Sequence, residues 1–171
     1  MSKFFTTRSL VITALLTALS VILRLLGFPQ DGVFRIELGF LPIAVASYFY
    51  GPIVGGISYI VADIVGTLFT GMSPFPPITV CKFLIGVVFG LFFYKRKAEI
   101  KNIILCNVVI FIFIDLIAMP FALLPISGDK SFFVILWSRV LAGLINVPLR
   151  TVAIWLTFKY FNPDKMGGRQ Y

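Results

Sequence analysis

The sequence predicts an all-α membrane protein: six transmembrane helices in a compact bundle, with both termini in the cytoplasm. Of its 171 residues, 59% are hydrophobic and only 13% are charged, whereas a soluble domain carries about a quarter charged residues. A spanning helix needs about 20 mostly apolar residues, so the chain has room for about six spans with short connections. A soluble catalytic domain does not fit, and residues 1–171 are predicted to form a single transmembrane domain.

Apolar stretches and helix breakers divide the chain into the predicted spans. The first stretch has a basic N-terminal flank like a signal peptide, but no small-x-small cleavage site follows it, so it is interpreted as a retained helix. Gly51-Pro52 predicts a tight turn between the second and third spans. Pro74, Pro76 and Pro77 predict an extended third loop over residues 70–77. The predicted spans are residues 9–26, 36–50, 53–69, 78–94, 103–124 (with Pro120 near its end) and 133–161 (interrupted at Pro148).

The basic residues set the predicted orientation, because cytoplasmic loops are enriched in Lys and Arg. With the N-terminus inside, three basic residues lie at the outer side: Arg24, Arg35 and Lys130. Nine lie in the inner segments: Lys3, Arg8, Lys95, Arg96, Lys97, Lys101, Lys159, Lys165 and Arg169. This asymmetry places both termini in the cytoplasm and makes the protein a multi-pass protein of the cell membrane.

Several function classes are disfavoured by the composition. The net charge of +8 is distributed as the positive-inside rule requires, which argues against nucleic-acid binding. The chain has no His, and Cys81 and Cys106 lie in apolar stretches without metal-ligand spacing, so neither a metal site nor a disulfide framework is expected. No nucleophile or paired-carboxylate motif is present. The sequence therefore predicts a protein that is not an enzyme and needs no cofactor.

Charged residues inside the apolar stretches are the main functional signal, since an unpaired ion in a bilayer costs several kcal/mol or more. Most of this charge lies in the predicted outer half, and the basic groups outnumber the acidic ones there. Arg can bind a carboxylate in bidentate fashion, so the pattern favours an outward-facing pocket for a small anionic ligand. The predicted substrate-binding residues are Arg24, Arg35, Glu37, Phe40, Asp63, Phe75, Lys82, Trp137 and Arg139.

Structural roles remain open as alternatives for these residues. Arg24 and Arg35 can snorkel to the interface, and Trp137 fits an interfacial aromatic belt. Lys82 can pair with an acidic residue on another span, and Asp63 or Asp115 can face a neighbouring helix instead of the ligand. A second feature, Ala14-x-x-x-Ala18 in the first span, allows another helix to approach closely, either within the bundle or from a partner subunit.

Three segments carry a resemblance to a known family: Arg35-Ile-Glu-Leu-Gly-Phe-Leu-Pro-Ile-Ala44, Tyr50-Gly-Pro-Ile-Val-Gly-Gly-Ile57 and Ala62-Asp-Ile-Val-Gly66. The chain resembles the S components of energy-coupling factor (ECF) vitamin transporters, most closely their folate family. The resemblance implies a subunit that captures a vitamin from outside and delivers it inward. It also implies three partner subunits, a transmembrane coupling subunit and two cytoplasmic ATPases, and gives Ala14 and Ala18 the contact with the coupling subunit.

The resemblance favours folate as the vitamin and leaves pantothenate as the alternative. The third loop, Phe69-Thr-Gly-Met-Ser-Pro-Phe-Pro-Pro77, departs from the Pro-Thr-Gly-Pro-Tyr-Phe-Pro-Gly-like loop of folate-specific members. Folate requires aromatic walls and an acceptor for the donor edge of its pterin, a role that Glu37 or Asp63 can fill. A stand-alone channel or membrane scaffold is the alternative from a different class, although a channel requires a continuous polar path.

Overall fold

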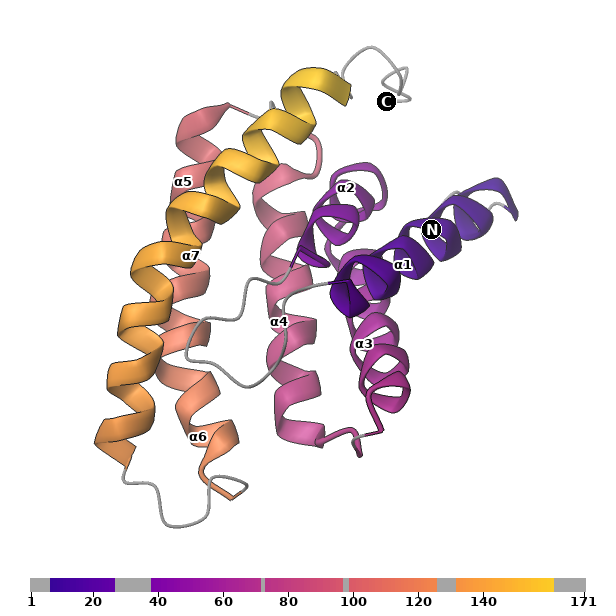
Figure 1. Ribbon diagram of the computed structural model, residues 1–171. Coiled ribbons are helices and arrows are strands. Elements are labelled where there is room, and N and C mark those ends of the chain that lie inside the picture. Colours follow the sequence, from indigo (N-terminus) through magenta and orange to yellow (C-terminus); the bar gives the residue numbers. More distant parts are fainter. Residues whose placement is uncertain (1–6, 27–37, 72, 97–98, 126–131, 162–171) are drawn as a thin grey trace.

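The computed structural model describes residues 7–26, 38–71, 73–96, 99–125 and 132–161, and all regular elements in these ranges are helices (Figure 1). Helix α5 continues directly into the π-helix η1 and then into α6, so residues 100–123 make one continuous rod. The elements are α1 (Thr7–Leu25), α2 (Phe40–Tyr50), α3 (Pro52–Phe69), α4 (Pro76–Phe93), α5 (Ile100–Val109), η1 (Ile110–Ala118), α6 (Met119–Leu123) and α7 (Phe132–Phe161).

Five of the helical rods are long and apolar enough to cross a membrane: α1, α3, α4, the α5–η1–α6 rod and α7. This confirms the all-helical membrane prediction for the described residues. The remaining predicted span corresponds to α2, which has only 11 residues. At a rise of about 1.5 Å per residue it is roughly 16 Å long, about half the thickness of a hydrocarbon core.

Proline positions account for the differences between the predicted and observed helix bounds. Helix α4 begins at Pro76, so Pro76 and Pro77 open the helix instead of closing the loop, because the first N–H groups of a helix need no intrahelical acceptor. Helix α7 continues through Pro148, where the prediction placed an interruption. The α5–η1–α6 rod likewise continues past Pro120.

The helices form two groups, α1 to α4 and α5 to α7, which meet mainly along α4 (Figure 1). Helices α3 and α4 pack most closely, and glycines allow this approach. A Cβ on Gly86 would lie 2.5 Å from the backbone oxygen of Gly55 and so cannot be accommodated without movement. The turn into α3 uses Gly51 with φ +90°, a conformation that favours glycine, which confirms the predicted Gly-Pro turn.

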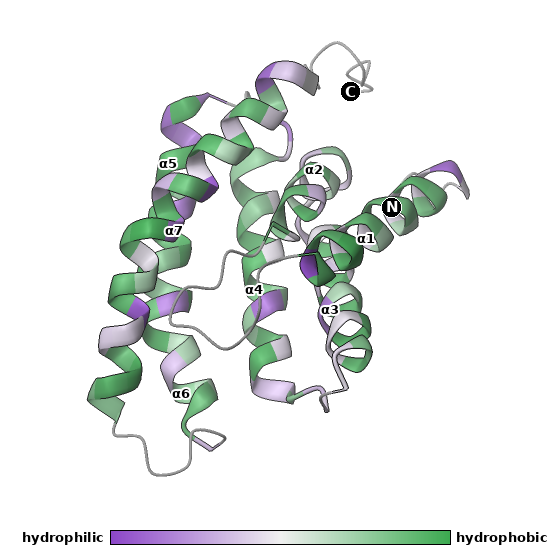
Figure 2. Cartoon of the chain, in the orientation of Figure 1, coloured by the Kyte–Doolittle hydropathy of each residue, from purple (hydrophilic) through white to green (hydrophobic). Residues whose placement is uncertain are grey.

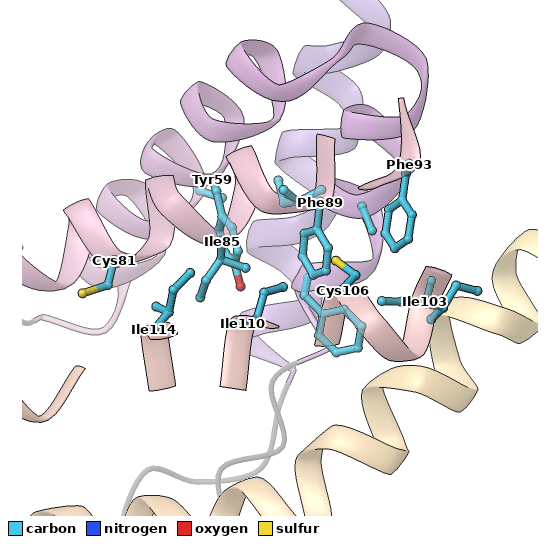
Figure 3. Packing of buried hydrophobic residues seen from close by; sticks show 14 of the residues in the cluster. Tyr59, Cys81, Ile85, Phe89, Phe93, Ile103, Cys106, Ile110 and Ile114 are labelled. Carbon is cyan, nitrogen blue, oxygen red and sulfur yellow. The ribbon is translucent and has the colours of Figure 1, made fainter. Parts of the chain in front are cut away.

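An apolar core fills the junction between the two groups. Phe89 and Phe93 of α4 stack with ring centroids 5.8 Å apart and lie against Ile103, Cys106 and Ile110 of the α5–η1 rod (Figure 3). All five side chains are fully buried. Large apolar side chains also cover the outside of the helices, as expected for a surface in contact with lipid, and hydrophilic positions are isolated among them (Figure 2).

Candidate functional site

The first polar cluster inside the bundle joins α1, α3 and α4. Arg24 Nη1 donates to Asp63 Oδ1 at 2.7 Å, and Arg24 Nη2 donates to Thr67 Oγ1 at 3.0 Å. The second carboxylate oxygen of Asp63 accepts from Thr79 Oγ1 at 3.1 Å. Only 11% of the Arg24 side chain and 4% of the Asp63 side chain are exposed. We call these four residues the α1–α3–α4 cluster.

Both oxygens of Asp63 and both terminal nitrogens of Arg24 are thus used within the protein. Gly66 makes room for the arginine, since a Cβ there would lie 3.0 Å from Arg24 Cδ. An ion pair of this kind is stable in a low-dielectric interior only when further hydrogen bonds satisfy its atoms, as the two threonines do here. These contacts fit the alternative role that the sequence leaves open for Asp63, in which it bonds to a neighbouring helix instead of to the ligand.

The second polar cluster joins the α5–η1 rod to α7. Arg150 Nη1 lies 3.7 Å from Asp115 Oδ2, and the guanidinium carbon of Arg150 lies 5.5 Å from the centre of the Phe40 ring. Asn107, which is fully buried, donates from Nδ2 to Thr151 Oγ1 at 2.9 Å. We call these five residues, Phe40, Asn107, Asp115, Arg150 and Thr151, the α5–α7 cluster.

This second cluster has unused hydrogen-bonding capacity. Three buried side-chain atoms of the described residues have no hydrogen-bond partner: Asn107 Oδ1 and Arg150 Nη1 in this cluster, and Arg24 Nε in the α1–α3–α4 cluster. The ion pair of Arg150 with Asp115 is longer than a hydrogen bond. Because an unsatisfied buried polar group costs about 1–3 kcal/mol, such a cluster is a candidate ligand-binding site.

Lys82 and Arg139 lie near this second cluster. Lys82, on α4, is buried, and its Nζ lies 5.2 Å from the centre of the Tyr59 ring. Helices α4 and α7 both pack against η1, so Lys82, Asp115 and Arg139 lie on elements that are in contact. Asp115 is paired with Arg150, and Lys82 and Arg139 are the two positive groups there that suit a carboxylate ligand.

The other predicted site residues lie in different surroundings. Phe40 is buried beneath Arg150, while Phe75 lies half-buried just before α4. Trp137 is 67% exposed, which suits an interfacial aromatic residue. Arg35 and Glu37 lie outside the described residues. Ala14 and Ala18 are both exposed on α1, which leaves that face open to another helix.

The structure adds Tyr59, Asn107, Thr151 and Arg150 to the candidate site residues. The sequence marks Arg150 as an intramembrane charge, but its depth in the inner half separated it from the predicted outer pocket. Asn107 and Thr151 belong to no motif, and an amide within an apolar stretch is the one signal that could have identified Asn107. No group of three or more His, Cys, Asp or Glu side chains in the described part of the chain is arranged to hold a metal ion.

A helical membrane protein with buried, partly unsatisfied polar groups fits a membrane-embedded binder of small molecules. Residues 8–156 match the family described as ECF transporter, substrate-specific component. The chain belongs to this family, and is therefore a multi-pass membrane protein that serves as the substrate-specific component of a transporter and is not an enzyme.

Two of the similar proteins carry the name FolT. The Folate transporter FolT of Clostridium novyi (strain NT) is 29% identical over 131 residues, which cover 76% of each chain. The crystal structure of FolT bound with folic acid has a TM-score of 0.78 at 27% identity, and the match covers 88% of this chain and 92% of that chain. The structure of the S component of a bacterial ECF transporter shares the fold, with a TM-score of 0.71 and 23% identity over 92% of this chain and 96% of that one.

Proposed function

We propose that this protein captures folate from outside the cell and delivers it inward together with a coupling subunit and two ATPases. The observation that carries the proposal is the similarity to FolT bound with folic acid, which extends over 88% of the chain. The charges agree with it: Lys82 and Arg139 are suited to the carboxylates of the ligand. In this proposal both termini lie in the cytoplasm, as the basic residues predict.

The packing supports a binding protein more than a channel. Phe89, Ile103 and Ile110 are fully buried between α4 and the α5–η1 rod, so apolar side chains fill that junction. A channel requires polar lining from one face of the membrane to the other. The polar groups described here instead form separate clusters between helices.

Titration of the purified protein in detergent with folate and with pantothenate, by calorimetry, tests the substrate. We expect one-to-one binding of folate, with the fluorescence of Trp137 and Trp155 as a second readout. Binding of pantothenate without any response to folate would keep the family and overturn the choice of vitamin. Binding of neither would overturn both vitamin assignments and leave the family unchanged.

Co-purification tests the partners. We expect the protein to bring down a coupling subunit and two ATPases, whereas a channel or scaffold is expected to self-associate. The exposed alanines of α1 are the proposed contact, since small residues allow close helix approach. The Ala14→Trp/Ala18→Trp variant should therefore lose the complex but keep folate binding. A matched Leu19→Trp variant, which changes an exposed large residue about 120° around the same helix from the Ala14 and Ala18 face, should keep both.

A further inference from the structure

We infer that the α5–α7 cluster recognises the heterocyclic end of the ligand, with Asp115, Arg150 and Asn107 reading the donor–acceptor edge of a pterin. The inference rests on the proposed function and names the residues that determine its specificity. It assigns the opposite, carboxylate-bearing end of the ligand to Lys82 and Arg139.

The hydrogen bonds around Asn107 leave one acceptor available. Thr151 Oγ1 donates its proton to the backbone oxygen of Val147 at 2.8 Å, so it can only accept from Asn107. Asn107 therefore directs its NH₂ group to Thr151, at 2.9 Å, and its amide oxygen is the atom left without a partner. Asn107 is fully buried, so a ligand donor reaches this oxygen only when the side chains around it move, and it then removes the cost of an unsatisfied group.

The π-helix brings Asp115 to the same side of the rod as Asn107. Within η1 the backbone bonds join residues five apart, as the bond from the Met119 N–H to the Ile114 oxygen shows. Ile110 lies three residues after Asn107 on the α-helix, and Asp115 lies five residues after Ile110 on the π-helix. In an uninterrupted α-helix, eight residues would turn Asp115 about 80° away from Asn107.

The groups left available match the edge of a pterin ring. Along that edge stand the 2-amino group and N3–H, which are donors, and O4, which is an acceptor. The Asp115 carboxylate can accept from the two donors, Arg150 can donate to O4, and Asn107 Oδ1 can accept the second proton of the amino group. Phe40, already against the Arg150 guanidinium, adds an apolar surface at the same place. Asp63, the acceptor that the sequence suggested, has both oxygens engaged.

The spacing along α7 separates the two ends of the site. Arg139 and Arg150 are 11 residues apart, or about 16 Å along the helix axis. An elongated ligand with a heterocycle at one end and carboxylates at the other suits two basic groups at this separation. Pantothenate lacks the flat donor–acceptor edge, so the α5–α7 cluster would remain unsatisfied with that vitamin.

The test compares Asp115→Asn and Arg150→Met with the wild-type protein, using folic acid and its 4-amino analogue as probes. Thr157→Val is the matched control, because Thr157 Oγ1 bonds only to the Ala153 oxygen of its own helix. The 4-amino group replaces the O4 acceptor with a donor, which then faces the Arg150 guanidinium. Calorimetry in detergent gives the affinities, and thermal unfolding shows that each variant is folded.

Each of the two variants should bind folic acid about 10- to 100-fold more weakly, the usual effect of losing a hydrogen bond to a charged group. The wild type should prefer folic acid to the 4-amino analogue, and Arg150→Met should reduce that preference. Thr157→Val should change neither. If a variant does not fold, the wild-type preference still tests Arg150, and equal affinities would overturn its role.

Failure of this inference is distinguishable from failure of the proposed function. A wild-type protein that binds folic acid, with variants that bind it equally well, overturns the role of the α5–α7 cluster and leaves the folate proposal intact. A wild-type protein that does not bind folic acid overturns the proposed function and this inference with it.

Discussion

The α1–α3–α4 cluster and the α5–α7 cluster each contain an Arg–Asp ion pair and threonine, but they differ in how completely their hydrogen bonds are satisfied. In the first, Arg24 and Asp63 are 2.7 Å apart, and two threonines bond the second terminal nitrogen and the second carboxylate oxygen. Arg24 Nε is the one polar side-chain atom of this pair without a hydrogen bond among the described residues. In the second, Arg150 and Asp115 are 3.7 Å apart, and buried polar atoms have no partner among the described residues. An intramembrane charge alone therefore does not identify a binding residue, and its remaining hydrogen-bonding capacity is the better criterion.

The largest expected effect is on stability, at the satisfied cluster. Asp63→Leu leaves the buried Arg24 charge without its partner and should lower the free energy of unfolding by about 3–5 kcal/mol. The double variant Arg24→Met/Asp63→Leu should recover most of this loss, because it removes both charges. Unfolding in mixed detergent micelles measures the effect. A loss of folate affinity without a loss of stability would instead place Asp63 in the binding site.

The next effect is on affinity, beside the unsatisfied cluster. Lys82→Ala and Arg139→Ala each remove a positive group proposed to contact a ligand carboxylate. Each should weaken folate binding about 10- to 100-fold and leave membrane insertion unchanged. Lys159→Ala is the control on α7, because Lys159 is exposed and lies 4.6 Å from the Trp155 ring centre. Unchanged calorimetric affinity in both test variants would remove the proposed carboxylate contacts.

A smaller effect concerns the helix packing that holds the first cluster in place. A Cβ on Gly90 would overlap the backbone of Pro52, whereas one on Gly143 would meet the ring of Phe111, a side chain that can turn aside. Gly90→Ala should therefore destabilise the protein by about 1–3 kcal/mol, and Gly143→Ala by less. Unfolding midpoints measured side by side test this, and a reversed order would contradict the described α3–α4 contact.

The smallest effect concerns a positioning residue of the second cluster. Thr151→Val removes the hydroxyl that holds the Asn107 amide, at a cost of about 1 kcal/mol in folate affinity. The preference for folic acid over its 4-amino analogue should not change, because Arg150 still determines it. A changed preference would show that Thr151 influences Arg150 as well as Asn107.

The sequence predicts the helices well because long apolar stretches leave few alternatives in a membrane. The Gly51-Pro52 turn was also predictable, since a proline after a glycine is a strong helix breaker. The predicted helix bounds were wrong at Pro76 and Pro148. Pro76 is the first residue of α4, where no intrahelical hydrogen bond is lost, and α7 continues through Pro148. The all-helical fold thus follows from composition, while the helix bounds depend on local backbone contacts.

The site was only partly predictable, because the role of a buried charge depends on its partners. Arg24 and Asp63 are 39 residues apart, and no local pattern indicates that they meet. Lys82 and Arg139 remain predicted ligand contacts on α4 and α7, the helices that pack against η1. Asn107 gives only a weak signal in the sequence, an amide within an apolar stretch, because its importance comes from one amide oxygen that has no partner among the described residues.

The π-helix makes the binding properties depend on the number of residues in the rod as well as on their identity. Deleting one residue from 116–118 would let the α-helix run through and turn Asp115 about 80° away from Asn107, although every proposed ligand contact would still be present in the sequence. Deleting one residue from 111–114 would instead leave seven residues between the two side chains and keep them within about 20° of each other. A change of one residue in the length of the rod after Asp115 would therefore alter the proposed site without replacing any of its side chains.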